Sequence, residues 1–443
     1  MRFEMIKGLG QRLSLADRDL SLVEIGRIKG RPFEKDQLTE AQLNHHVHVV
    51  GASGFGKTVF LSQIIKQQIN QGKGLFFIDL KSDIETMTNF ANFAVQAGRE
   101  KDFQNFSLGD HSVSMVYNLL GEGTATQIRD RIMNSLTWSE EYYRNVSSSF
   151  LLKALTGMLY LKRTAGMKVH LGTVLKACEN GELLKEVFAR IPEPETEIRR
   201  TVKSAIKFLT DAESLKSLQG LRSQLESIVL SDFGDLVASD REGIDLFETV
   251  RDGKLVFLYL DTRRYGETAK AVGRFILQDL KAVSAKIDGE IRKENRKPFS
   301  VIIDEFADLA QEDFIGFLDR ARSSKMSIVV SHQEISDLER ISPEFASRLT
   351  GNTASLYAFL QKNPKSADFI SAVAGTRTVS KKTHQEESIL GFATRTGGSS
   401  VRETEEFIVH PNVVKRLRVG ECVVVKKYPR ADAYVVKVDS GER

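Results

Sequence analysis

The sequence predicts an α/β fold, a parallel sheet interrupted by a block of helices. Short apolar runs alternate with helical segments over residues 46–117 and 250–443, which is typical of a parallel sheet covered by helices. Residues 118–249 show helical periodicity and no convincing strand. We therefore expect one α/β domain built from the two outer stretches, an inserted all-α domain, and a lead segment over residues 1–45, with or without a small β element.

The composition excludes several classes of protein. Of the 443 residues, 41% are hydrophobic and 28% are charged, as in globular proteins. The two cysteines, Cys178 and Cys422, are too far apart for a disulfide scaffold or a zinc module. Lys and Arg outnumber Asp and Glu by 63 to 59, too small an excess to establish a nucleic-acid partner. No apolar run approaches the ~20 residues that span a bilayer, and the N-terminus lacks a secretory signal, so we expect a cytoplasmic protein.

The first strand leads into a glycine-rich turn. HVHVV at 46–50 is a short strand, Thr58 to Asn70 has one apolar helical face, and Leu75 to Asp79 is a buried strand, so the order is β, α, β. Between the first strand and the helix, GASGFGKT matches the phosphate-binding pattern G-x-x-x-x-G-K-[ST]. The loop amides would surround the phosphates of ATP, Lys57 would reach the β and γ phosphates, and Thr58 would bind Mg²⁺. The predicted nucleotide-binding residues are Gly51, Ala52, Ser53, Gly54, Phe55, Gly56, Lys57 and Thr58.

Helical periodicity marks the insertion. It is clearest over Arg129–Leu136, Phe150–Leu161 and Ile198–Leu209. Strand-like runs then return at four places, which indicates that the sheet resumes: Lys254–Leu260, Phe299–Asp304, Met326–Ser331 and Ser355–Leu360.

Two acidic residues end the second of these strands. Asp304 would hold the hydrated Mg²⁺, and Glu305 would polarise the attacking water, as in a Walker B strand. The alternative is that the pair only caps the following helix. Gln333, at the end of the next strand, is the candidate γ-phosphate sensor, and Arg322, or its neighbour Arg320, the candidate arginine that completes a neighbouring subunit's site.

Other patterns favour structural roles. His45, His46 and His48 are close in sequence, but alternation along a strand separates the side chains, so a structural role is favoured over a metal site. Residues 376–403, rich in Ser, Thr and Gly, predict a long loop or hairpin. The runs Glu421–Lys426 and Ala433–Val438 predict a terminal hairpin.

The order of these motifs resembles the coupling ATPases of type IV secretion and conjugation, the TraG/TraD-type relatives of the FtsK and HerA DNA pumps. The resemblance covers most of the chain. It is carried by HVHVVGASGFGKT, IDLKSD, WSEEYYRNVSSSF, LRSQLESIVLSDFGDLV, GRFILQDLKA, VIIDEFADL, SHQEISDLE, TGNTAS and IVHPNVVKRLRVGECVV.

The resemblance implies a RecA-like nucleotide-binding domain with an all-α domain, assembled as a hexameric ring with ATP between subunits, although truncated members are often monomeric. The ring would recruit a relaxase-bound DNA strand, without reading its sequence, or protein effectors, and hand them to channel components in the inner membrane. Members usually carry an N-terminal transmembrane hairpin, so the chain would reach that membrane through partners or through a missing anchor. The family's Asp-Pro-Lys-Gly-Glu motif appears as Asp79-Leu-Lys81-Ser-Asp83.

Three functions follow. The leading one is an ATP-hydrolysing ring motor that moves DNA or a DNA–protein complex. A substrate-receptor ATPase for protein effectors is the alternative. A binding module in which nucleotide only sets the oligomeric state is the third.

Overall fold

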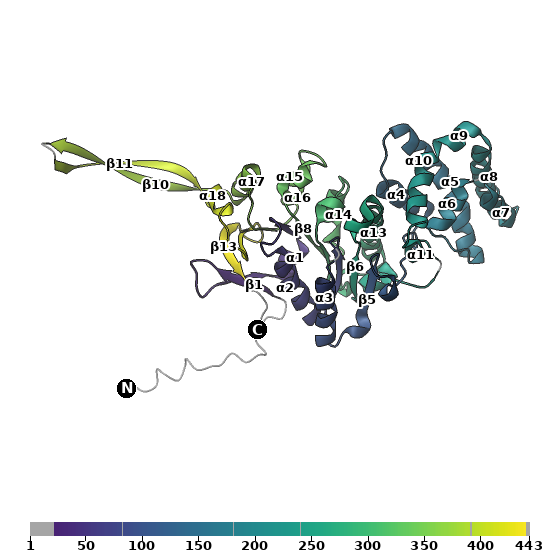
Figure 1. The fold of residues 1–443 in the computed structure, drawn as a ribbon, viewed down its shortest axis with the longest axis horizontal. Helices are drawn as coiled ribbons and strands as arrows, with labels where there is room; N and C mark the ends of the chain where they lie inside the picture. The colour runs from purple at the N-terminus through teal and green to yellow at the C-terminus, as the bar shows by residue number, and fades with distance from the viewer. Residues whose placement is uncertain (1–21, 82, 180, 240, 390–391, 440–443) are drawn as a thin grey trace.

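A computed structural model describes residues 22–81, 83–179, 181–239, 241–389 and 392–439. The molecule is elongated, with a sheet at its centre, a block of helices at one end and a long hairpin projecting from the other (Figure 1). None of the helices in these ranges is both long enough and apolar enough to cross a membrane.

The central sheet has eleven described strands in the order β2-β1-β13-β12-β9-β3-β8-β7-β4-β6-β5. Seven neighbouring strands are parallel: β9 (Ser355–Ala358), β3 (Val47–Val50), β8 (Met326–His332), β7 (Phe299–Ile303), β4 (Gly74–Asp79), β6 (Leu255–Tyr259) and β5 (Phe103–Ser107). The other four extend one edge in antiparallel pairing: β12 (Glu421–Lys426), β13 (Asp432–Val438), β1 (Val23–Ile28) and β2 (Lys35–Leu38).

Helices cover both faces of the parallel part. Because side chains alternate along a strand, Leu75 and Phe77 of β4 join one apolar core and Phe76 and Ile78 the other. Helix α2 (Lys57–Asn70) and α3 (Ile84–Gln96) contribute to the first core. The second contains α13 (Thr262–Glu290), α14 (Phe314–Ala321) and α16 (Phe345–Gly351) and continues into the helical block. Strands buried on both faces explain why the sequence shows continuous apolar runs.

The inserted segment is helical, as predicted. It comprises α4 (Ala125–Ser135), α5 (Glu141–Ala165), α6 (Leu171–Glu179), α7 (Glu182–Arg190), α8 (Thr196–Thr210), α9 (Ala212–Ser217), α10 (Gln219–Val229), α11 (Gly234–Val237) and α12 (Leu246–Asp252).

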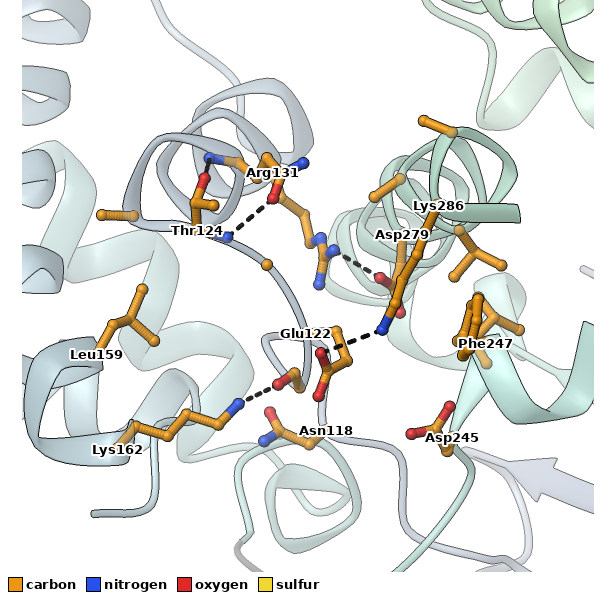
Figure 2. A pocket seen from close by; sticks show the side chains of 18 of the residues that line it. Asn118, Glu122, Thr124, Arg131, Leu159, Lys162, Asp245, Phe247, Asp279 and Lys286 are labelled. Carbon is orange, nitrogen blue, oxygen red and sulfur yellow. Dashed lines mark hydrogen bonds and ion pairs between the residues drawn. The ribbon is translucent and has the colours of Figure 1, made fainter. Parts of the chain in front are cut away.

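A buried ion pair joins this helical block to the sheet domain. Arg131 of α4 lies 2.6 Å from Asp279 of α13, which also accepts a hydrogen bond from Tyr117 at 2.6 Å. Beside it lies a cavity of about 1420 Å³, between the two domains. Figure 2 shows Lys286 of α13 reaching Glu122 across the same cavity, 3.6 Å away. The cavity thus marks the junction between the domains.

The stretch predicted as a loop or hairpin is a hairpin. β10 (Thr376–Ile389) pairs with β11 (Phe392–Phe407), and within the described part of the chain these strands pair only with each other. The hairpin projects from α17 (Pro364–Ala374) and α18 (Pro411–Val414), as Figure 1 shows.

Candidate nucleotide-binding site

The glycine-rich turn lies where β3 ends and α2 begins. Gly54 and Gly56 have φ angles of 81° and 109°, which favour glycine because other residues meet a steric penalty there. Gly56 is the N-cap of α2 and supplies no side-chain cap, so the first amides of the helix point into the turn without an intrahelical acceptor. Those amides and the positive end of the helix dipole form a site for phosphate oxygens.

Lys57 is held inside this turn. It is buried, and its Nζ donates to the carbonyls of Gly51 at 2.5 Å and Ala52 at 3.4 Å. Burial lowers the pKa of Lys57 and the nearby Lys81 lowers it further, while carboxylates close by oppose both effects. The ammonium is therefore close to the place that the phosphates would occupy. Thr58 follows at an exposed position in the first turn of α2.

The predicted acidic pair lies at the same edge of the sheet. β7 is separated from β3 by β8 alone, so Asp304 and Glu305 end their strand beside the glycine-rich turn. Asp304 is buried and accepts a hydrogen bond from the Glu305 amide at 3.1 Å. Glu305 has a left-handed φ of 54°, a conformation that costs on the order of 1 kcal/mol for a non-glycine residue. Glu305 occupies the N-cap position of the short 3-10 helix Phe306–Asp308, but its side chain makes no capping hydrogen bond there.

Two further side chains converge on Glu305. Gln333, the predicted sensor, donates from Nε2 to Glu305 Oε1 at 3.2 Å. Lys81 forms an ion pair with the same oxygen, and its Nζ lies 3.5 Å from Asp304 Oδ2. Burial by itself lowers the pKa of Lys81, but the two carboxylates outweigh it and raise the pKa.

Lys81 is the site residue that the sequence analysis did not assign. It comes from the turn after β4, the strand next to β7. Asp79 holds this turn by accepting hydrogen bonds from the amides of Lys81 and Asp83, at 2.8 and 3.3 Å. Burial raises the pKa of Asp79 to about 6. The sequence pattern that could have indicated Lys81 is Asp79-Leu-Lys81 at the carboxyl end of a strand. Only the topology of the sheet, however, shows that β7 is the neighbouring strand.

Arg322 does not join these residues. It follows α14 at the amino end of β8, where its carbonyl accepts a hydrogen bond from Asn44 at 3.2 Å. The seven residues of β8 place the two edges of the sheet about 23 Å apart. Arg322 therefore cannot reach a nucleotide bound to its own chain. Arg320, two residues earlier, is exposed.

The three neighbouring histidines have different surroundings, but alternation along a strand is not the reason, because His46 precedes β3 and has a left-handed φ of 68°. His46 Nε2 donates to the Leu318 carbonyl at 2.8 Å, and its Nδ1 accepts from the Ile328 amide at 3.1 Å. These bonds tie the start of β3 to α14 and β8, so the predicted structural role is confirmed for His46. His48 points to a different partner, the buried His332 at the end of β8.

Comparisons with known proteins fit this geometry. Residues 298–419 match the family described as the TraM recognition site of TraD and TraG. The type 4 coupling protein DotL of Legionella pneumophila is 19% identical over 89% of this chain, and the chain spans 60% of the length of DotL. The bacterial conjugative coupling protein TrwB, lacking its first 70 residues, has a similar fold, with a TM-score of 0.65 and 16% identity over 94% of this chain and 89% of TrwB.

The chain is a relative of the type IV coupling proteins. A VirB4 structure from Thermoanaerobacter pseudethanolicus is also similar, with a TM-score of 0.56 and 12% identity over 95% of this chain and 97% of VirB4. At such identities the likeness concerns the fold. Among coupling proteins, the TrwB structure determined with ADP and Mg²⁺ has a TM-score of 0.63, 15% identity and coverage of 94% and 90%. The predicted family and the predicted RecA-like domain with an inserted all-α domain are thus confirmed.

Proposed function

We propose that this coupling-protein relative hydrolyses ATP at the carboxyl edge of its sheet. The observation that carries the proposal is the meeting of three features at one place: the glycine-rich turn with Lys57, the acidic pair Asp304 and Glu305, and Gln333 on Glu305. A phosphate cradle, a buried carboxylate for a metal ion and a second carboxylate for water are the parts that phosphoryl transfer needs.

Thr58 and Asp304 are the proposed Mg²⁺ ligands. The buried carboxylate of Asp304 suits the ion, because this position already attracts a cation, the Lys81 ammonium 3.5 Å from Oδ2. Hydroxyl and carboxylate oxygens are also the ligands that Mg²⁺ prefers. When bound, the ion would neutralise charge on the β and γ phosphates.

The remaining residues act on the phosphates and on water. Lys57 leaves its carbonyl partners and binds phosphate oxygens, where charge develops during transfer. Glu305 accepts the proton of the attacking water. Gln333 fixes Glu305 Oε1 by its hydrogen bond and is placed to sense the γ phosphate.

A ring of subunits would complete the site. Arg322 lies at the amino edge of the sheet, a strand length away from the nucleotide of its own chain. An arginine there can act only on a nucleotide bound by a neighbour, which is the arrangement of an arginine acting in trans. The proposed assembly is a hexamer, and Arg320 is the second candidate for the same role.

The substrate is proposed to be DNA, alone or attached to a relaxase, bound through its backbone and moved through the ring to channel components in the inner membrane. The chain would act at the cytoplasmic face of that membrane, held by partners or by an anchor. A receptor for protein effectors is the second candidate. It is favoured by the hairpin, in which five basic and five acidic residues over 376–407 leave no net charge to attract a phosphate backbone.

ATP turnover with and without DNA tests this proposal. The rate of the wild-type protein should rise with protein concentration, rise again with single- or double-stranded DNA at low salt, and lose the DNA effect at high salt. The Lys57→Ala variant should show no turnover. A Lys57-dependent rate that ignores DNA at both salt concentrations would contradict DNA transport and support the effector receptor.

A further inference from the structure

Two buried histidines link the phosphate-binding strand to the sensor strand. His48 lies in β3, three residues before Gly51, and His332 is the last residue of β8. The parallel register pairs His48 with Val330 and Val50 with His332, so the two rings are diagonal neighbours on one face of the sheet. The rings are stacked with centroids 4.9 Å apart and are fully buried.

The hydrogen bonds around this pair define one set of tautomers. His332 Nδ1 lies 2.9 Å from the Glu334 carbonyl, which can only accept, so Nδ1 carries the proton. In a neutral ring His332 Nε2 is then an acceptor, and His48 Nε2 donates to it at 2.6 Å. His48 Nδ1 in turn accepts from the Thr350 hydroxyl at 3.1 Å. Every ring nitrogen has one partner when both histidines are neutral.

This chain of bonds ends at the Glu334 carbonyl, in the turn that also carries Gln333, the residue that contacts Glu305. The His332 ring holds the carbonyl of Glu334, and the His332 carbonyl accepts from the Gly51 amide at 3.2 Å. Gln361 donates to the carbonyl of Gln333 at 3.0 Å. Gln333 is thus held from both sides in the turn that presents it to Glu305.

We infer that the His48–His332 pair is a positioning device, which holds the sensor turn against the phosphate-binding strand so that Gln333 meets Glu305. The inference rests on the proposed ATPase function. Burying two imidazoles costs desolvation that an apolar pair of similar size would avoid, so packing alone does not explain them. A fully satisfied buried network instead fixes one geometry. Charged groups nearby are Lys57, Asp337 and Lys427.

The pair can be tested by removing one histidine or both. His332→Leu and His48→Leu each leave a buried nitrogen without a partner, so both should lower the unfolding midpoint. The double variant contains no unpaired ring nitrogen and should regain part of that loss. The turnover rate of the double variant should not recover together with its unfolding midpoint. We expect kcat to fall at least about tenfold in His332→Leu and to stay low in the double variant, because Glu334 has lost its hydrogen-bond donor, while the Kd for a fluorescent ADP analogue changes less than about twofold.

A second buried pair supplies the matched control. Ser300 and Ser327 hydrogen-bond at 2.8 Å between β7 and β8, near the amino ends of the strands. The Ser300→Ala/Ser327→Ala variant should keep the wild-type kcat. A His48→Leu/His332→Leu protein with wild-type kcat would overturn the inference.

Amide hydrogen exchange tests the positioning role of the His48–His332 pair independently of ATPase activity. Exchange at residues 333–335 should be faster in the double histidine variant than in the wild type and unchanged in the double serine variant. If the wild type shows no ATP turnover, the proposed ATPase function is wrong, and amide hydrogen exchange alone then tests the positioning role of the histidine pair. Unchanged exchange at these amides would refute it.

Discussion

Replacing Lys81 by methionine would remove the cation that pairs with both Asp304 and Glu305. At 3.5 Å and an effective dielectric constant near 20, its attraction to Asp304 is about 4 to 5 kcal/mol, and we halve this because Lys81 is 25% exposed. The variant should therefore be about 2 kcal/mol less stable than the wild type without metal. Mg²⁺ should recover the loss, since the ion no longer competes with the ammonium for Asp304.

Thermal unfolding at a series of Mg²⁺ concentrations measures how much of the stability lost with the Lys81 ammonium is recovered by Mg²⁺. A tenfold tighter Mg²⁺ affinity in Lys81→Met corresponds to about 1.4 kcal/mol of additional stabilisation at saturating ion. Lys270 is a matched control, because it is 24% exposed and also bridges two carboxylates, Glu267 and Asp308, both at 3.1 Å. Lys270→Met should respond to Mg²⁺ as the wild type does. Equal Mg²⁺ responses of all three proteins would refute the idea that Lys81 occupies the place of the ion.

Two further predictions concern stability. Burial lowers the pKa of His46 to about 4. Below pH 6.5 the unfolded chain therefore binds a proton at this position that the folded chain does not bind. The contribution of neutral His46 to the free energy of unfolding is complete above pH 6.5 and should fall by about 2 kcal/mol between pH 7 and 5. Burial also lowers the pKa values of His48 and His332, so both proteins should lose stability over this range. Urea titrations should show a fall that is about 2 kcal/mol larger for the wild type than for His46→Gln, and parallel pH dependences would contradict the prediction. The buried Lys426 lies 3.2 Å from Asp36, which also accepts from Tyr357 and Tyr434. Lys426→Met should cost about 3 to 5 kcal/mol by leaving that carboxylate unpaired, and a thermal midpoint unchanged from the wild type would show otherwise.

Much of the sheet was predictable because its parallel strands are apolar on both faces. The strands at Phe299, Met326 and Ser355 begin where the sequence analysis placed them. The strand Phe103–Ser107 was missed because FQNFS mixes polar and apolar residues without a clear period. The lead segment contributes β1 and β2 to the antiparallel edge, which only long-range pairing with β13 defines.

The candidate site likewise contains residues that a local sequence pattern predicts and residues that only the order of the strands brings together. Lys57, Asp304 and Glu305 belong to motifs with a local pattern, and their positions follow from the ends of their strands. Lys81 and the His48–His332 pair depend on which strands are neighbours, information that no local pattern contains. For Arg322, the structure of one chain shows only that the residue lies at the amino edge of the sheet.

Single-turnover ATP hydrolysis by the wild type and Glu305→Gln, with nucleotide binding measured on the same samples, tests the proposed role of Glu305 directly. Glu305→Gln should bind Mg²⁺ and ATP with at least wild-type affinity but hydrolyse ATP about a hundredfold or more slowly, because the amide cannot accept the proton of water. Hydrolysis at the wild-type rate by Glu305→Gln would contradict the central claim that the carboxyl edge of this sheet is a catalytic site built around Glu305.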